Sequence, residues 1–120
     1  MNARSRQQAE RFGRVAEGAA AFLLVAKGYR LLARRYRAPG GEIDLIARRG
    51  QVIAFVEVKA RRTLESAIDA VTPTARKRIH QASTHWLARY KDSDRLGVRF
   101  DIIAVTPTRL HHYKDAWRPW

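Results

Sequence analysis

The chain has 120 residues and a net charge of +13, which suits one basic domain with a single core. It contains no cysteine, which excludes disulfides and thiolate metal sites. No apolar run is long enough to cross a bilayer, so we expect a soluble, cytoplasmic protein without a membrane partner. The pI near 11.3 favours an anionic partner, with nucleic acid preferred over an anionic membrane.

The first predicted element is a helix over residues 8–27, followed by Gly28 as a stop signal. Residues 1–12 are expected to form a flexible, basic N-terminal arm of the single domain 1–120. Glu17 lies off the main apolar face of this helix, and we weigh a solvated Glu17 equally against a functional one. The apolar stripe is predicted to contain Phe12, Val15, Ala16, Ala19, Phe22, Leu23 and Ala26.

Strands are predicted next, over residues 30–37 and then in a β-hairpin. The hairpin strands are residues 41–47 and 52–59, joined by a turn that contains Gly50. β-Branched and aliphatic residues fill both hairpin strands, yet each strand also carries acidic residues. Two carboxylates and an ammonium in such a setting cost several kcal/mol unless something compensates them. These charged residues are Asp44, Glu57 and Lys59, with Glu42 at the start of the first strand.

The register of the hairpin decides whether the acidic residues meet. A loop of two or four residues places Asp44 opposite Glu57 or diagonal to it, within reach of one bound ion. A three-residue loop separates the two side chains unless a bulge restores the register. In the first case a divalent cation with oxygen ligands compensates Asp44 and Glu57, and Lys59 can face a phosphate or a water molecule.

The second half of the chain begins with a connection over residues 60–71, which could contain one helical turn. Thr72 is a helix N-cap and Pro73 the first helical residue, and this helix is expected to end near Tyr90. A strand follows at residues 98–105, and the tail could form a last short strand. The predicted order is α-β-β-β-α-β, a mixed α/β domain with helices flanking a small central sheet.

Basic residues crowd the first two turns of the second helix, where they oppose the helix dipole. A bound phosphate would relieve that repulsion, and for Lys77 we weigh phosphate binding evenly against solvation. The candidate nucleic-acid contacts are Arg61, Arg62, Arg76, Lys77 and Arg78.

Other functional classes find little support in the sequence. The four histidines have no recognisable zinc-ligand spacing. There is no phosphate-cradling glycine loop and no serine-histidine-aspartate arrangement. Trp86 lies on an apolar stripe, which favours a core position over base stacking.

Four segments together resemble the YraN family of small bacterial proteins, over about residues 13–117. That family is similar in fold to archaeal Holliday junction resolvases and other restriction-endonuclease-like PD-(D/E)xK nucleases. One departure from the family pattern is Arg35, which stands where asparagine is usual. The matching segments are Gly-Glu-Ile-Asp-Leu-Ile-Ala from Gly41, Phe-Val-Glu-Val-Lys-Ala-Arg from Phe55, Ala-Val-Thr-Pro from Ala70, and Arg-Phe-Asp from Arg99.

The resemblance implies a restriction-endonuclease-like fold and a site that binds Mg²⁺ or Mn²⁺. Asp44 and Glu57 would be the metal-binding carboxylates, with the carbonyl of Val58 as a further ligand. Lys59 would orient the attacking water or stabilise the developing charge, and Glu17 would assist the metal site. Glu42 and Asp101 also belong to the matching motifs and are expected to have supporting roles. For Asp101 we expect structural support of the site.

We therefore predict a metal-dependent nuclease that acts on DNA, including branched or structured DNA, with DNA favoured over RNA. A homodimer, as in the junction resolvases, is a further possibility. Two alternatives stay open. One is a non-catalytic nucleic-acid-binding module with a nuclease-like fold, and the other is a basic RNA- or ribosome-associated protein whose hairpin acids pair with arginines.

Overall fold

A computed structural model describes residues 2–120 of the chain. None of the helices in this part is both long enough and apolar enough to cross a membrane. The elements in chain order are α1 (Ala3–Ala26), β1 (Arg30–Ala38), β2 (Gly41–Arg49), β3 (Val52–Ala60), α2 (Leu64–Asp69), α3 (Pro73–Leu87), a 3₁₀ turn (Ser93–Arg95), β4 (Gly97–Val105) and β5 (Leu110–Trp117).

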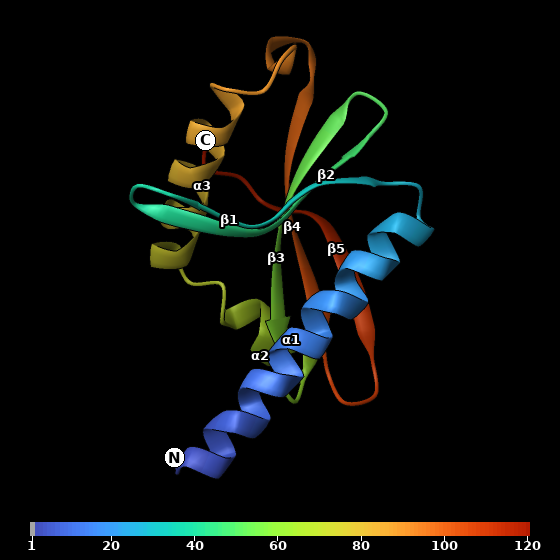
Figure 1. Ribbon diagram of the computed structural model, residues 1–120, viewed down its shortest axis with the longest axis vertical. Helices are drawn as coiled ribbons and strands as arrows, with labels where there is room; N and C mark the ends of the chain where they lie inside the picture. Colours follow the sequence, from blue (N-terminus) through green and yellow to red (C-terminus); the bar gives the residue numbers. More distant parts are fainter. Residues whose placement is uncertain (1) are drawn as a thin grey trace.

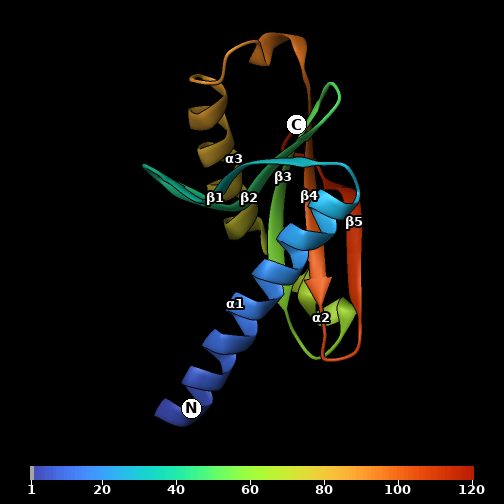
Figure 2. The same cartoon turned by 45° about the vertical axis from the view of Figure 1, so that its right-hand side comes forward.

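The five strands form one mixed sheet in the order β1-β2-β3-β4-β5. Neighbouring strands are antiparallel, except that β4 is parallel to β3. The connection between these two parallel strands contains α2 and α3. Helix α1 packs on one face of the sheet and α3 on the other (Figures 1 and 2). The predicted α/β fold is confirmed, and its architecture is compatible with a restriction-endonuclease-like domain.

Both faces of the sheet are buried, because β2, β3 and β4 carry apolar residues on both sides. On the α1 side, the core includes Leu24, Leu45, Val56 and Ile103. On the α3 side, it includes Ile46, Phe55, Ile79, Phe100 and Ile102.

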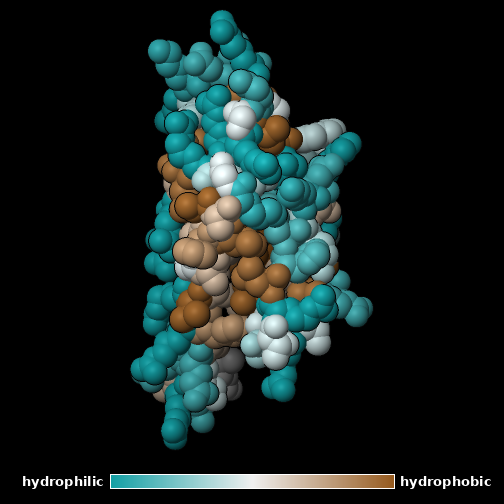
Figure 3. Space-filling view, turned by 90° about the vertical axis from the view of Figure 1, so that its right-hand side faces the viewer, coloured by the Kyte–Doolittle hydropathy of each residue, from teal (hydrophilic) through white to brown (hydrophobic). Residues whose placement is uncertain are grey.

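Most of the residues predicted to form the buried apolar stripe of α1 are exposed in the structure, so that prediction is wrong. The buried line of the helix follows a spacing of four residues, through Ala16, Ala20 and Leu24. Small side chains on this line allow the helix to approach the sheet closely. Val15 and Phe22 are instead 68% and 76% exposed. The side of the molecule that carries the C-terminal half of α1 and β5 accordingly shows apolar surface near its middle (Figure 3).

Helix α1 also begins earlier than predicted. The side chain of Asn2 accepts a hydrogen bond of 2.8 Å from the backbone N–H of Ser5 and so caps the helix at Ala3. Residues 2–11 are exposed, and this end of α1 extends past the sheet (Figure 2). The described part of the expected N-terminal arm is therefore helical.

The start of α3 matches the prediction, since Thr72 caps it through a hydrogen bond of 3.1 Å from Ala75 N. The helix ends at Leu87, a few residues before the predicted end. It packs directly on the start of β2, because a Cβ atom at Gly41 would lie 1.9 Å from the carbonyl oxygen of Arg78. This close packing fixes the basic N-terminal half of α3 relative to β2.

Candidate functional site

The candidate site lies where the pairing of β2 with β3 ends. The hairpin has a two-residue turn, with Arg49 opposite Val52, and the last paired residues are Leu45 and Val56. Beyond that pair, β2 is paired only with β1, and β3 only with β4. The register is therefore the one that directs Asp44 towards Glu57, as a two-residue loop predicts.

Asp44 lies in the fork between the two strands. Its Oδ2 atom accepts a hydrogen bond of 2.8 Å from the backbone N–H of Val58. This bond satisfies a backbone donor that the interrupted ladder leaves without a strand partner. The carboxylate is thus held by the backbone of β3, next to the strand that carries Glu57.

The side chain of Glu57 is partly buried and contacts the carboxyl group of Asp44. Burial raises the pKa of Glu57 to about 9, and the hydrogen bond with Asp44 and the charge of Asp44 add to this effect. The charge of Lys59 acts in the opposite direction. The raised pKa of Glu57 therefore favours a metal-free pair of carboxyl groups that together hold one proton at neutral pH.

A cleft of about 370 Å³ opens between α1 and this fork, and its lining includes Asp44, Val58 and Glu17. A second hollow of about 190 Å³ shares Glu17 and Asp44 with it and reaches Glu42. Glu57 and Lys59 line neither hollow. The residues that give the cleft a positive rim are Arg14, Arg35 and Arg37.

Glu17 reaches the cleft but is already paired there. Its Oε1 atom lies 3.0 Å from Arg35 Nε and 3.4 Å from Arg34 Nη2. Arg35 has a φ of 51°, which is uncommon for a residue other than glycine. The only unusual feature of the sequence at Arg35 is that it stands where the resembling family usually has asparagine. The pairing itself was not predicted.

The remaining predicted site residues are more dispersed. Lys59 is partly buried on β3, whereas Glu42 is exposed and lies 3.9 Å from Arg37. Arg61 and Arg62 are exposed just after β3. On α3, Lys77 and Arg78 are exposed, while Arg76 is partly buried and donates a hydrogen bond to the carbonyl oxygen of Val71.

The fork offers an incomplete set of ligands for a divalent cation. Two adjacent carboxyl groups that share a proton are suitable oxygen donors for Mg²⁺ or Mn²⁺, because the ion can replace that proton. Within residues 2–120, however, no group of three or more Asp, Glu, His and Cys side chains is arranged to hold one ion. The side chains fit a cation through Asp44 and Glu57, with the other positions left to backbone oxygen, water or substrate.

Comparison with known proteins identifies the family of the chain. The sequence model of the family described as "Uncharacterised protein family UPF0102" matches residues 16–105 of this chain. A UPF0102 protein of Rhizobium etli (strain CIAT 652) is 53% identical over 113 residues, which cover 93% of each chain. The chain belongs to the UPF0102 family. UPF0102 is also known as YraN, so the resemblance seen in the sequence is confirmed.

Two other UPF0102 proteins show how far the similarity extends. The protein of Rhizobium meliloti (strain 1021) is 57% identical over 106 residues, which cover 88% of this chain and 87% of the relative. The protein of Paramagnetospirillum magneticum (strain ATCC 700264 / AMB-1) is 49% identical over 120 residues, which cover 96% of this chain and 93% of the relative. The UPF0102 match includes the whole fork, from Asp44 to Lys59, and also Asp101.

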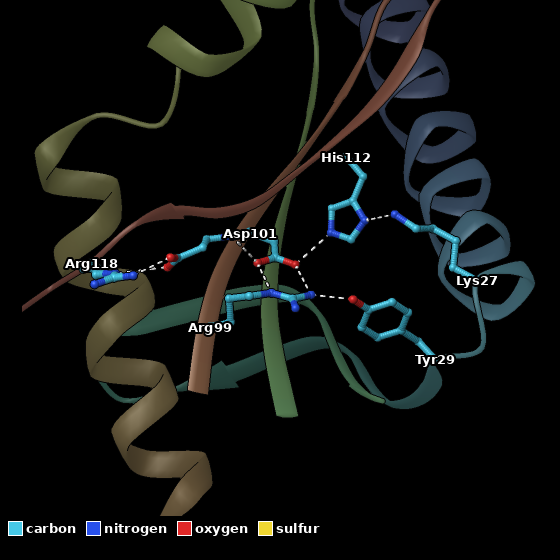
Figure 4. Close-up of polar contacts among 7 residues, drawn as sticks. Lys27, Tyr29, Arg99, Asp101, His112 and Arg118 are labelled. Carbon is cyan, nitrogen blue, oxygen red and sulfur yellow. Dashed lines mark hydrogen bonds and ion pairs between the residues drawn. The ribbon is translucent and has the colours of Figure 1, made fainter. Parts of the chain in front are cut away.

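Asp101 of this UPF0102 chain is fully buried in a polar network on β4 (Figure 4). Its carboxylate accepts hydrogen bonds from Arg99 at 2.8 and 2.9 Å and lies 2.7 Å from Nε2 of His112. Tyr29 contacts Arg99, and Lys27 lies 2.7 Å from Nδ1 of His112. These bonds tie α1, β4 and β5 together. The sequence indicated Asp101, within the segment that begins at Arg99, but not Tyr29 or His112, which are distant along the chain.

Asp101→Asn is expected to lower the free energy of unfolding by about 3 kcal/mol, because the change leaves the charge of Arg99 without its partner. Burial acts to raise the pKa of Asp101, but hydrogen bonds from His112 and Arg99 outweigh it and hold the pKa below its usual value. This stabilisation is present above the unfolded-state pKa and is lost as pH falls through the folded-state pKa. Urea unfolding at several pH values measures the effect.

Asp115→Asn is the matched control, because Asp115 forms an exposed ion pair with Arg118 and reaches Asp101 only through its backbone N–H. It should change the stability little. Equal losses in the two variants would contradict a structural role of the Asp101 carboxylate.

Proposed function

We propose that this UPF0102 protein is a metal-dependent nuclease that hydrolyses phosphodiester bonds in DNA, including branched or structured DNA. The observation that carries the proposal is the contact between Asp44 and Glu57 at the fork of the sheet, with the pKa of Glu57 raised to about 9. A chain with a net charge of +13 has many arginines with which it could neutralise these acids. It instead leaves the two carboxyl groups against each other, where a cation can replace their shared proton.

The residues around the fork have separate roles in this proposal. Asp44 and Glu57 would hold Mg²⁺ or Mn²⁺, with the carbonyl of Val58 as a further ligand, and the ion would supply charge neutralisation and a more acidic water molecule. The hydrogen bond from Val58 N keeps Asp44 oriented. Lys59, whose charge already acts on Glu57, would stabilise negative charge that develops on the phosphate. The arginines of the cleft would hold the phosphates of the strand.

The experiment that tests this function is a cleavage assay on branched, single-stranded and duplex DNA, with RNA of the same sequence as a comparison. We expect cleavage of DNA in the presence of Mg²⁺ or Mn²⁺ and none in the presence of EDTA. Lys59→Ala should lose most of the activity but keep its affinity for DNA. The absence of cleavage on every substrate, or equal activity of wild type and Lys59→Ala, would contradict the proposal.

A second candidate function is a non-catalytic module that binds nucleic acid. It is favoured by the pairing of Glu17 with Arg34 and Arg35, because this pairing occupies an acid of the cleft that the proposed nuclease would use beside its metal site. Such a module would bind DNA equally well with and without a divalent ion. A nuclease should bind the ion and require it for cleavage.

Arg35→Asn tests whether that arginine restrains the site. Asparagine tolerates a positive φ, whereas a left-handed conformation costs most other residues about 1–2 kcal/mol. The change also removes the shorter of the two ion pairs of Glu17 and leaves only the contact with Arg34 at 3.4 Å. We expect the variant to bind Mn²⁺ several-fold more tightly than the wild type does, measured by calorimetric titration. Arg37→Asn removes the same charge from the same cleft without releasing Glu17. An equal gain in the two variants would show only a general electrostatic effect.

A further inference from the structure

A separate recess lies on the α3 side of the protein, between the N-terminal half of α3 and the segment that follows β5. The C-terminal segment runs back towards α3 (Figure 1). The recess has a volume of about 280 Å³ and is lined by Arg76, Lys77, His80, Trp117 and Arg118, with a proline at each end of the set. These residues define the α3 pocket. It shares no residue with the cleft at Asp44.

The described residues that line the α3 pocket include three basic side chains and no carboxylate. Arg118 is paired with Asp115 outside the pocket, so Arg76 and Lys77 supply its positive charge. Arg76 is fixed in place, since its Nε donates a hydrogen bond of 3.1 Å to the carbonyl oxygen of Val71. Its guanidinium group also lies 5.8 Å from the centre of the Trp117 ring. The first turn of α3 carries no acidic residue, so an anion in the pocket would relieve repulsion among these cations.

Trp117 gives a second, independent indication of a ligand. It forms part of the pocket wall and is only 7% exposed. Its indole Nε1 is buried and has no hydrogen-bond partner within residues 2–120. A buried N–H group without a partner is unfavourable, and native proteins usually supply an acceptor. Because this N–H has almost no exposed surface, we expect a ligand with acceptor oxygens in the pocket to reach it by a small shift of the indole ring.

We propose that the α3 pocket binds one phosphate group of a nucleic-acid strand. A phosphate offers several acceptor oxygens and negative charge, which match the guanidinium of Arg76, the exposed ammonium of Lys77 and the indole donor of Trp117. The choice of a nucleic-acid strand as the source of this phosphate depends on the proposed function. The pocket then anchors the substrate at a point outside the cleft, so that one strand contacts the protein on α3 as well as at the fork.

The indole N–H signals in a ¹⁵N–¹H spectrum test the site directly. Trp117→Phe identifies the signal of Trp117, and Trp86 provides an internal reference on the same helix as Lys77. The probes are inorganic phosphate and one DNA oligonucleotide prepared with and without a 5′-phosphate, all without divalent ions. We expect the signal of Trp117 to shift while that of Trp86 stays in place. If no phosphate-bearing probe shifts the Trp117 signal, the proposal is wrong.

Lys77→Gln provides the second readout. We expect it to weaken oligonucleotide binding about fivefold and to lower the salt dependence of binding by about one released ion. Lys91→Gln removes the same charge from an exposed loop residue and should retain the wild-type salt dependence. Equal effects of the two substitutions would overturn the proposal.

The two forms of the oligonucleotide distinguish the source of the phosphate. A preference for the phosphorylated form that Lys77→Gln abolishes assigns the pocket to a strand end, whereas equal binding of both forms, weakened by Lys77→Gln, assigns it to an internal phosphodiester. Both results support the phosphate site. Because no metal is present, failure here is independent of any failure to cleave, and Lys77→Gln should still bind Mn²⁺ at the fork.

Discussion

Asp44→Asn is expected to reduce DNA cleavage by about a thousandfold while the fold is retained. The amide oxygen of asparagine can still accept the hydrogen bond from Val58 N, so the fork keeps its backbone support. The substitution removes the negative charge that a divalent ion requires, and the charge stabilisation supplied by such an ion is worth several kcal/mol. Each 1.36 kcal/mol corresponds to about a tenfold change in rate. Single-turnover cleavage with Mn²⁺, together with the unfolding midpoint, measures both parts of the prediction.

Asp94→Asn is the matched control, because it makes the same chemical change at an exposed residue in the 3₁₀ turn. It should cleave DNA at the wild-type rate. Wild-type activity of Asp44→Asn would show that the acids at the fork do not carry the reaction. A parallel loss in both variants would indicate a nonspecific effect of charge.

Glu57→Gln is expected to stabilise the metal-free protein by about 3 kcal/mol at pH 7, measured by urea unfolding. The glutamine amide is neutral, like a protonated Glu57, and can donate a hydrogen bond to Asp44, but it has no acidic proton to lose. In the wild type, burial raises the folded-state pKa of Glu57 to about 9, against an ordinary value of 4.5. The stability that depends on this group is therefore complete below pH 4.5 and decreases as pH rises towards 9, by about 1.36 kcal/mol per unit.

The difference between Glu57→Gln and wild type should therefore grow from about pH 4.5 and level off near pH 9. Addition of Mn²⁺ should reduce it, because only the wild type gains stability from the bound ion. Glu65→Gln, at an exposed position on α2, should show no such pH dependence. A wild type that is more stable than Glu57→Gln at pH 7 without metal would contradict the raised pKa.

The sequence was most informative about the hairpin and the elements that follow it. β-Branched runs, the turn at Gly50 and the cap at Thr72 are local signals, and they gave the strands, the start of α3 and the register that brings Asp44 to Glu57. Helix α1 shows the limit of periodicity. Its alanines and larger apolar residues occupy several lines, and only packing against the sheet decided that Ala16 and Ala20 are buried while Phe22 is exposed.

The charged contacts between distant segments were largely beyond prediction. Nothing near Glu17 in the sequence indicates that Arg35 will bind it, because the contact depends on the crossing of α1 over β1 and on the unusual φ of Arg35. His112 was considered only as a potential zinc ligand, yet it lies beside Asp101. Such pairs form only when the sheet assembles. The sequence therefore indicated the acids that the fold brings together at the fork, but not all of their partners.

Calorimetric titration with Mn²⁺ at several pH values tests most directly whether the acids at the fork form a cation site. We expect one ion to bind the wild type with release of about one proton at neutral pH, and the affinity to rise by up to tenfold per pH unit until about pH 9. Asp44→Asn and Glu57→Gln should lose this binding. Absence of Mn²⁺ binding to the wild type, or equal binding to Asp44→Asn, would contradict the account.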